Sequence, residues 1–166
     1  MGMTEIRTGR LVLKKLKESD IPTLVSEIGN WEVTKWLSSV PHPYTQDDAR
    51  YWLERASKNK AKLSIFKENV LIGGVGLTQD DGGYYELGYW LGESNWRNGY
   101  ATEAARSLLH YAKGTLHYKK FKSSYMVGND GSAKVLNKLG FKTIGESEVY
   151  CLSRKETVPS IKLVLE

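Results

Sequence analysis

The chain has 166 residues, of which 40% are hydrophobic and 26% charged, the composition of a soluble globular protein. This length fits a single domain over 1–166 that can bury an ordinary core. No apolar run approaches the roughly 20 residues of a membrane-spanning helix, so we expect no membrane partner. A lone cysteine, Cys151, excludes an internal disulfide, and with no signal-peptide pattern the expected compartment is the cytoplasm.

The formal net charge of +5 favours anionic partners such as nucleic acid, the ribosome, a membrane surface or a phosphorylated cofactor. The charge alone does not choose among these, and a solvated surface with a small bias explains it equally. Four lysines around the end of the predicted helix 99–116 form a basic cluster. They are Lys113, Lys119, Lys120 and Lys122.

The N-terminal part of the chain predicts one strand followed by three helices. These are a strand at residues 10–17 and helices at 19–27, 31–37 and 45–57. Ser19 is a good N-cap for the first of these helices and Thr45 for the third. Asp47 and Asp48 stand in the first turn of the third helix, where the helix dipole favours anions.

The remainder predicts a strand meander and then alternating helices and strands. Strands are expected at 62–67, 70–77, 84–91, 121–127, 141–152 and 160–165, and helices at 99–116 and 132–139. Residues 154–159 are expected to form a loop. One strand, helices, three strands, helix, strand, helix and two strands together indicate an α+β fold with a mixed central sheet.

The segment 85–106 reads as a strand, a polar turn and a helix with an apolar stripe. Such a turn leaves the first backbone N–H groups of the helix unpaired, which makes an anion site usually occupied by phosphate. Gly99 and Ala101 are small where the backbone and a ligand would approach closely. A plain strand-to-helix turn, with small residues kept for packing, explains the segment about as well.

A second segment, 129–141, reads on its own as a capped short helix. It combines Asn-Asp-Gly-Ser at 129–132 with Lys-Leu-Gly-Phe at 138–141. It follows Gly-Tyr-Trp-Leu at 88–91 and Trp-Arg-Asn-Gly-Tyr-Ala-Thr-Glu-Ala at 96–104. In this order the motifs resemble the GNAT superfamily of acyl-CoA-dependent N-acyltransferases, most closely its RimJ/RimL-like branch of ribosomal-protein N-terminal acetyltransferases. The likeness covers nearly the whole chain.

The resemblance implies the GNAT fold, with a mixed, mostly antiparallel central sheet flanked by helices. It implies transfer of an acetyl group from the cosubstrate acetyl-CoA, without a metal, to a primary amine. The acceptor would be a protein N-terminal α-amine or a small-molecule amine, and ribosome association, a monomer and a homodimer are all compatible with the branch. The alternatives are a coenzyme A-binding member with little catalysis and a basic module that binds nucleic acid or the ribosome.

The resemblance also implies which residues contact the cofactor. The splayed strand around Tyr89, Trp90 and Leu91 would pair with the pantetheine arm, and Asn129 and Ser132 would lie close to it. The pyrophosphate would be held by the turn and the first helical residues, which are Arg97, Asn98, Gly99, Tyr100, Ala101 and Thr102. Arg97 stands where the branch commonly has glycine, so it either adds a phosphate contact or narrows the loop.

The reaction needs a neutral amine. Neutralising an α-amine with a pKa near 8 at pH 7 costs about 1 kcal/mol, against roughly 4.6 kcal/mol for a lysine side chain. A weak base acting through water therefore suffices for an N-terminus. Glu86, on the strand face shared with Gly88 and Trp90, is the candidate base, and a simple surface carboxylate is the alternative.

Many superfamily members carry a tyrosine acid in the second helix, at the position of Leu136 here. Ser132 is then the nearest hydroxyl able to protonate the leaving thiolate, although a helix cap is an equal interpretation. In this family the N-terminal helical region covers the acceptor. We therefore expect Trp36, His42 and Tyr44 near the acceptor, with burial in the core or an ordinary loop position as the simpler alternatives.

Overall fold

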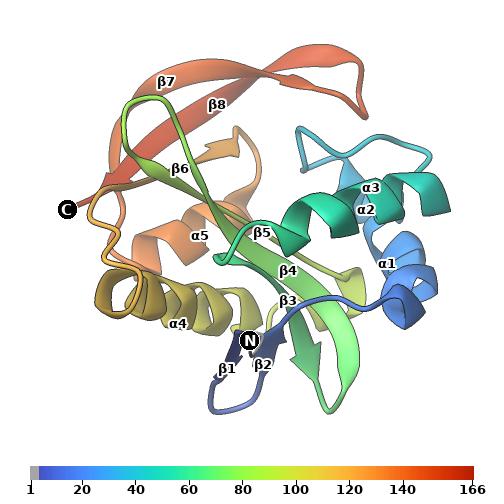
Figure 1. The fold of residues 1–166 in the computed structure, drawn as a ribbon. Coiled ribbons are helices and arrows are strands. Elements are labelled where there is room, and N and C mark those ends of the chain that lie inside the picture. The colour runs from blue at the N-terminus through green and yellow to red at the C-terminus, as the bar shows by residue number, and fades with distance from the viewer. Residues whose placement is uncertain (1–3) are drawn as a thin grey trace.

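The structure, a computed structural model, describes residues 4–166 and contains one eight-stranded sheet in the order β1-β2-β3-β4-β5-β6-β8-β7 (Figure 1). Every pair of neighbouring strands is antiparallel except β5 and β6, which are parallel. The predicted α+β class with a mixed, mostly antiparallel sheet is therefore confirmed. The strands are β1 (Glu5–Arg7), β2 (Val12–Lys14), β3 (Lys62–Lys67), β4 (Val70–Gln79), β5 (Tyr85–Leu91), β6 (Phe121–Met126), β7 (Lys142–Cys151) and β8 (Glu156–Leu165).

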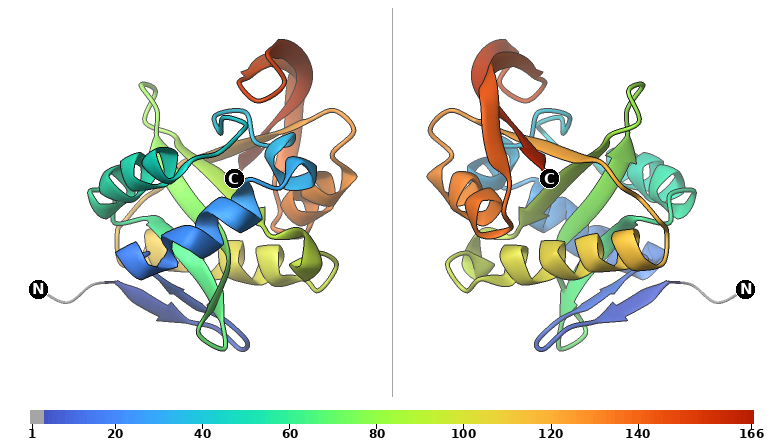
Figure 2. Two further views of the ribbon diagram at one scale, coloured as in Figure 1. Left: turned by 90° about the vertical axis from the view of Figure 1, so that its right-hand side faces the viewer. Right: turned by 90° about the vertical axis from the view of Figure 1, so that its left-hand side faces the viewer.

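Helices cover both faces of this sheet (Figure 2). One face carries α1 (Ile21–Ile28), α2 (Trp31–Thr34) and α3 (Gln46–Ser57), and the other carries α4 (Tyr100–Gly114) and α5 (Asp130–Lys138). Short 3-10 turns lie at Glu18–Asp20 and Glu93–Asn95. Within residues 4–166, no helix has the length and apolar character needed to cross a lipid bilayer.

The long helix α4 is fixed by the apolar stripe that its sequence predicts. Ala104, Ala105, Leu108 and Ala112 are fully buried, and they pack in one cluster with strand residues such as Leu63 and Ile65. Small alanines let the helix approach the sheet closely, while leucine fills the remaining space. The N-terminus of α4 is thereby held at the carboxyl end of β5.

Several predicted boundaries are wrong in detail. The strand expected at 10–17 is shorter as β2, and β1 was not predicted. Ser19 lies inside the first 3-10 turn, and Asp20 occupies the N-cap position of α1. The loop expected at 154–159 contains the start of β8, where the carbonyl of Pro159 accepts a hydrogen bond from Val127 N. Proline is tolerated there because the β6–β8 ladder ends at the pair Met126 with Ser160, so Pro159 lies just beyond its last rung.

Lys15 ties the segment that follows β2 to the end of α3. Its ammonium donates to the carbonyl oxygens of Ala56, Asn59 and Lys62, at 2.6, 2.5 and 2.8 Å. The last carbonyls of a helix have no partner within the helix, and a cation there also interacts favourably with the helix dipole. Lys15 therefore joins the helical layer to the sheet at the start of β3.

We expect Lys15→Met to lower the free energy of unfolding by about 2 kcal/mol, because methionine keeps the aliphatic stem but leaves carbonyl groups unpaired. Urea denaturation followed by circular dichroism measures the change. The matched control is Lys17→Met at an exposed position, which we expect to stay within about 0.5 kcal/mol of the wild type. Equal effects of the two substitutions would contradict the assigned role of Lys15.

Candidate active site

The parallel strands β5 and β6 part soon after they begin. Their only paired residues are Tyr85 with Phe121 and Glu86 with Lys122. At the point of divergence the Ser123 hydroxyl donates to Leu87 O at 2.8 Å, so a side chain replaces the next rung of the ladder. Beyond this bond a gap opens between the two strands.

The register of β5 decides which backbone groups face this gap. Gly92 N donates to Ile72 O of β4, whereas Tyr85 N donates to Lys120 O beside β6, both at 2.8 Å. Because N–H and C=O groups alternate sides along a strand, Tyr89 presents its backbone to the gap and Trp90 presents its backbone to β4. The Trp90 indole lies over Gly74 on the α1–α3 face of the sheet.

The turn after β5 is shaped for the N-terminus of α4. Arg97 and Gly99 adopt left-handed conformations, with φ of 66° and 78°. The Asn98 side-chain amide donates to Asn95 O and Trp96 O at 3.2 and 3.0 Å, which holds the loop. Gly99 occupies the N-cap position of α4 and supplies no side-chain cap, so the first N–H groups of the helix are free for an anion.

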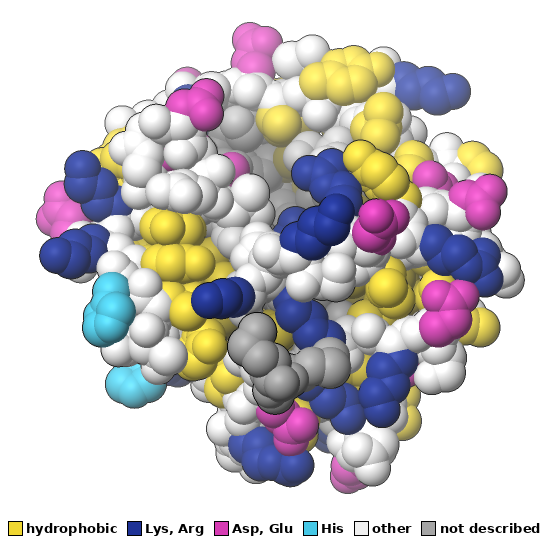
Figure 3. All heavy atoms as spheres, in the orientation of Figure 1, with side chains coloured by type: hydrophobic (Ala, Val, Ile, Leu, Met, Phe, Trp, Pro, Cys, Tyr) yellow, Lys and Arg dark blue, Asp and Glu magenta, His cyan; other side chains and the backbone are white. Residues whose placement is uncertain are grey.

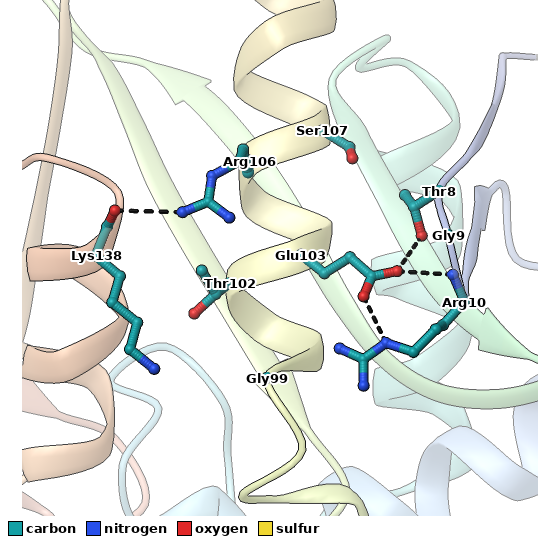
Figure 4. A pocket seen from close by; sticks show the side chains of 9 residues that line it. All are labelled: Thr8, Gly9, Arg10, Gly99, Thr102, Glu103, Arg106, Ser107 and Lys138. Atoms are coloured by element: carbon teal, nitrogen blue, oxygen red, sulfur yellow. Dashed lines mark hydrogen bonds and ion pairs between the residues drawn. The ribbon is translucent and has the colours of Figure 1, made fainter.

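A cavity of about 530 Å³ extends from this turn along the outer side of α4 (Figure 4). Gly99, Thr102 and three cationic side chains, Arg10, Arg106 and Lys138, line it. The Arg10 guanidinium binds the Glu103 carboxylate at 2.7 Å and donates to Asn98 O at 2.9 Å. With the Thr8 hydroxyl also bound to Glu103, these contacts hold the β1–β2 loop against α4.

Two hydroxyl groups meet across the gap. Tyr89 Oη lies 2.7 Å from Ser132 Oγ and 3.2 Å from Ser132 O, at the first turn of α5. Burial raises the pKa of Tyr89 to about 12, so this phenol keeps its proton at neutral pH. The hydrogen bond joins a strand and a helix that the sequence separates widely, and no pattern along the chain predicts it.

The remaining residues of the 129–141 segment have structural roles. Asn129 caps α5, and its side-chain oxygen accepts from Ser132 N at 3.2 Å. Leu136, at the position of the tyrosine found in many superfamily members, is fully buried in the core shared with α4. The cap of α5 is therefore Asn129, which leaves the Ser132 hydroxyl for its contact with Tyr89.

Glu86 and its neighbours lie on the opposite, α1–α3 face of the sheet. The Glu86 side chain is exposed, one alternate position along β5 from Gly88. Lys122, beside it on β6, is paired with Asp80, and this hydrogen bond together with the charge of Glu86 raises the pKa of Lys122. Glu86 therefore stands in solvent next to the point where β5 and β6 separate.

The β7–β8 hairpin closes over this face. Arg154 Nε donates to Lys35 O at 2.8 Å, and Leu152 N donates to Ser38 O at 2.9 Å. Trp36 packs beneath the hairpin, with the Arg154 guanidinium 4.9 Å from its ring and Met126 in the same cluster. Trp36 thus lies at the end of β6, beside the wide end of the gap.

The other two predicted acceptor residues are placed differently. His42 is exposed, and its ring lies 4.9 Å from that of Trp31. Tyr44 is only 9% exposed and packs in the cluster between α1, α3 and the sheet, a burial that raises its pKa to about 12. Core packing accounts for Tyr44 without an acceptor role, and Tyr44 and Trp36 belong to different hydrophobic clusters.

Sequence reasoning missed the cations that line the cavity beside α4. Arg10, Arg106 and Lys138 come from three separate elements, and only the fold brings them to one cavity. Arg106 could have been noticed, since it stands nearly two turns after Gly99 on a helix whose N-terminus was expected to bind phosphate. Arg10 and Lys138 carry no such signal, because their distance from the turn depends on the sheet order and on the packing of α5.

Comparison with known proteins identifies this arrangement. A family profile described as "Acetyltransferase (GNAT) domain" matches residues 10–142. The uncharacterized N-acetyltransferase p20 of Bacillus licheniformis is 27% identical over 152 residues, which cover 86% of this chain and 85% of that protein. A GNAT-family acetyltransferase from Bacillus anthracis superposes with a TM-score of 0.86 at 20% identity, over 98% of both chains.

A further solved structure carries a ligand. RimL, described as a ribosomal L7/L12 alpha-N-protein acetyltransferase in complex with coenzyme A, matches with a TM-score of 0.77 at 20% identity over 98% of both chains. At these identities the two structural likenesses concern the fold, whereas the family profile spans most of the chain itself. The chain therefore belongs to the GNAT family of acetyltransferases and is an acetyl-CoA-dependent N-acetyltransferase.

Proposed function

We propose that this enzyme acetylates an α-amine, at a protein N-terminus or on a small molecule, in the manner of the RimJ/RimL-like branch. The observation that carries the proposal is the gap between β5 and β6, which leads from the uncapped N-terminus of α4 to Glu86. If acetyl-CoA binds in this gap, its phosphates contact the N-terminus of α4 while its thioester lies at the face where the acceptor arrives. RimL, which matches over 98% of both chains, is described as acting on an α-amine.

The cofactor would be bound by backbone more than by side chains. The free N–H groups at Gly99, Ala101 and Thr102 would hold the pyrophosphate, and the gap-facing backbone of Tyr89 and Leu91 would pair with pantetheine. The cavity beside α4, with its cationic wall, would receive the outer phosphate and the nucleoside. The positive φ of Arg97 turns the loop back toward α4 and leaves the exposed guanidinium free for a phosphate oxygen.

In the reaction, the neutral amine nitrogen attacks the thioester carbonyl, and the C–S bond then breaks to leave an amide and a thiolate. Glu86, directly or through water, takes the proton that the nitrogen loses. Either hydroxyl of the Tyr89–Ser132 pair can be the donor, and in the orientation in which Tyr89 donates to Ser132 Oγ, the Ser132 O–H would be free to donate to the departing sulfur. Backbone N–H groups of β5 stabilise the oxyanion between these steps.

We expect Gly99→Glu to weaken acetyl-CoA binding more than tenfold, because a carboxylate would stand where the phosphates bind. The matched control is Gly99→Asn, since asparagine tolerates the left-handed conformation that this position requires. Isothermal titration calorimetry measures the affinities, and thermal melting checks that both variants fold. If the Glu and Asn variants bind acetyl-CoA equally, the pyrophosphate does not lie at this turn.

We expect Glu86→Gln to lower kcat about tenfold or more and to move the rise of the pH–rate profile toward the pKa of the free amine. The loss should be larger for lysine-like amines than for α-amines, because the former are harder to deprotonate. The measurement is release of free coenzyme A thiol across pH 6 to 10. A profile that coincides with that of the wild type would dismiss Glu86 as the base.

We expect Tyr89→Phe to lower kcat severalfold while the KM for acetyl-CoA stays unchanged, because Ser132 loses the bond that orients its hydroxyl. Ser132→Ala should cost more, and the double variant should be no slower than Ser132→Ala alone. Steady-state kinetics on the four proteins complete the cycle. Multiplicative effects of the two substitutions would mean that the two hydroxyls act independently.

A further inference from the structure

Two neighbouring glycines leave part of the α1–α3 face beside the gap without side chains of its own. The strand register places Lys62 of β3, Gly76 of β4 and Gly88 of β5 side by side. Nothing lies within 4 Å of the position where a Cβ of Gly88 would stand, so the space above it is open. A Cβ on Gly76 would instead meet Lys62, whose Cγ and Cε lie 3.3 and 3.4 Å from it.

The Lys62 side chain therefore lies flat across β4 and extends toward β5. Two strand spacings, about 9.6 Å, separate the backbone of Lys62 from that of Gly88. An extended lysine side chain spans more than half of this distance. An ammonium extended in this way stops less than one strand spacing short of Gly88, beside the open space above that glycine.

No anionic partner satisfies this ammonium within residues 4–166, where Lys62 takes part in no ion pair. Its charged neighbours are two further cations, Arg55 of α3 and Lys15. Burial together with the charge of Arg55 lowers the pKa of Lys62. Arg55 itself is held against Tyr51, to whose hydroxyl it donates at 3.2 Å. A half-buried cation beside a second cation is costly unless an anion joins them.

Lys62 and Gly88 lie on the same face of the sheet as Glu86. Figure 3 shows this face hollowed below the β7–β8 hairpin, with basic side chains gathered on the side of α3. Glu86 stands one alternate position from Gly88, on the same face of β5. The open floor at Gly88 thus has a carboxylate next to it on β5 and an unpaired ammonium across β4.

We propose that Lys62 binds an anionic group of the acceptor, a carboxylate or phosphate a few bonds from the reacting amine, while Glu86 faces the amine. This inference rests on the proposed function and adds the chemical class of the acceptor. An amino acid and a peptide with an acidic second residue both present this pair of charges. The shared chemistry is a primary amine with a neighbouring anion.

The test compares matched acceptors that differ only in the anion. One arm uses free amino acids against their carboxamides, and the other uses N-terminal peptides with Glu against Gln at the second position. We expect the wild type to favour the anionic member of at least one pair by tenfold or more in kcat/KM, measured by thiol release. Lys62→Met, which keeps the stem over Gly76, should abolish this preference and leave the neutral acceptors within about twofold.

Lys60→Met, at an exposed position two residues away, is the control and should keep the wild-type preference. The proposal is overturned if the wild type shows no preference in either arm, or if Lys62→Met slows neutral and anionic acceptors alike. Calorimetric titration of the same compounds onto the protein loaded with coenzyme A tests anion binding at Lys62 separately from acetyl transfer. Absence of thiol release from every amine defeats the proposed function, whereas Lys62-dependent binding of the anionic compounds would still support the anion site.

Discussion

The parting of two parallel strands is the constraint on which the rest of the site depends. A sheet resists such a gap, because each lost rung leaves an N–H and a C=O without partners. Here Ser123 covers the first vacant carbonyl, that of Leu87, and the Trp96 indole covers that of Leu91 at 2.9 Å. Between these two side chains the backbone of Tyr89 stays open, and this is the stretch of β5 at which we propose that the pantetheine binds.

The two hydroxyls that we propose for the reaction, those of Tyr89 and Ser132, lie in contact with each other. Leu136 contributes only packing to the core, and the phenol comes instead from Tyr89 on the opposite wall. Because Tyr89 belongs to the strand that would contact the pantetheine, the position of its hydroxyl is coupled to the position of the cofactor. Ser132 is thus oriented from the strand side as well as by the cap at Asn129.

Local signals in the sequence predicted α4, the turn before it, the cap at Thr45 and the mixed sheet, since periodicity and capping act over a few residues. Contacts that depend on the register between strands could not be predicted from such local signals. In the sequence Lys15 is an ambiguous strand residue, whereas in the structure its ammonium caps the end of α3. Lys62 is predicted only as the first residue of a strand, whereas in the structure its side chain lies across Gly76. Pro159 led to the prediction of a loop, which is wrong because the sequence does not reveal that the neighbouring strand β6 ends at this level.

The distribution of positive charge bears on the choice between an enzyme and a nucleic-acid-binding module. Three of the four clustered lysines are engaged within the protein: Lys122 with Asp80, Lys120 over Tyr84, and Lys113 over Phe121. Cations instead line the cavity beside α4, and two others, Lys62 and Arg55, lie close together on the opposite face of the sheet. Two separate basic sites, joined by the gap between β5 and β6, suit a phosphorylated cofactor and a small anionic acceptor better than a continuous phosphate backbone, which needs an unbroken basic surface.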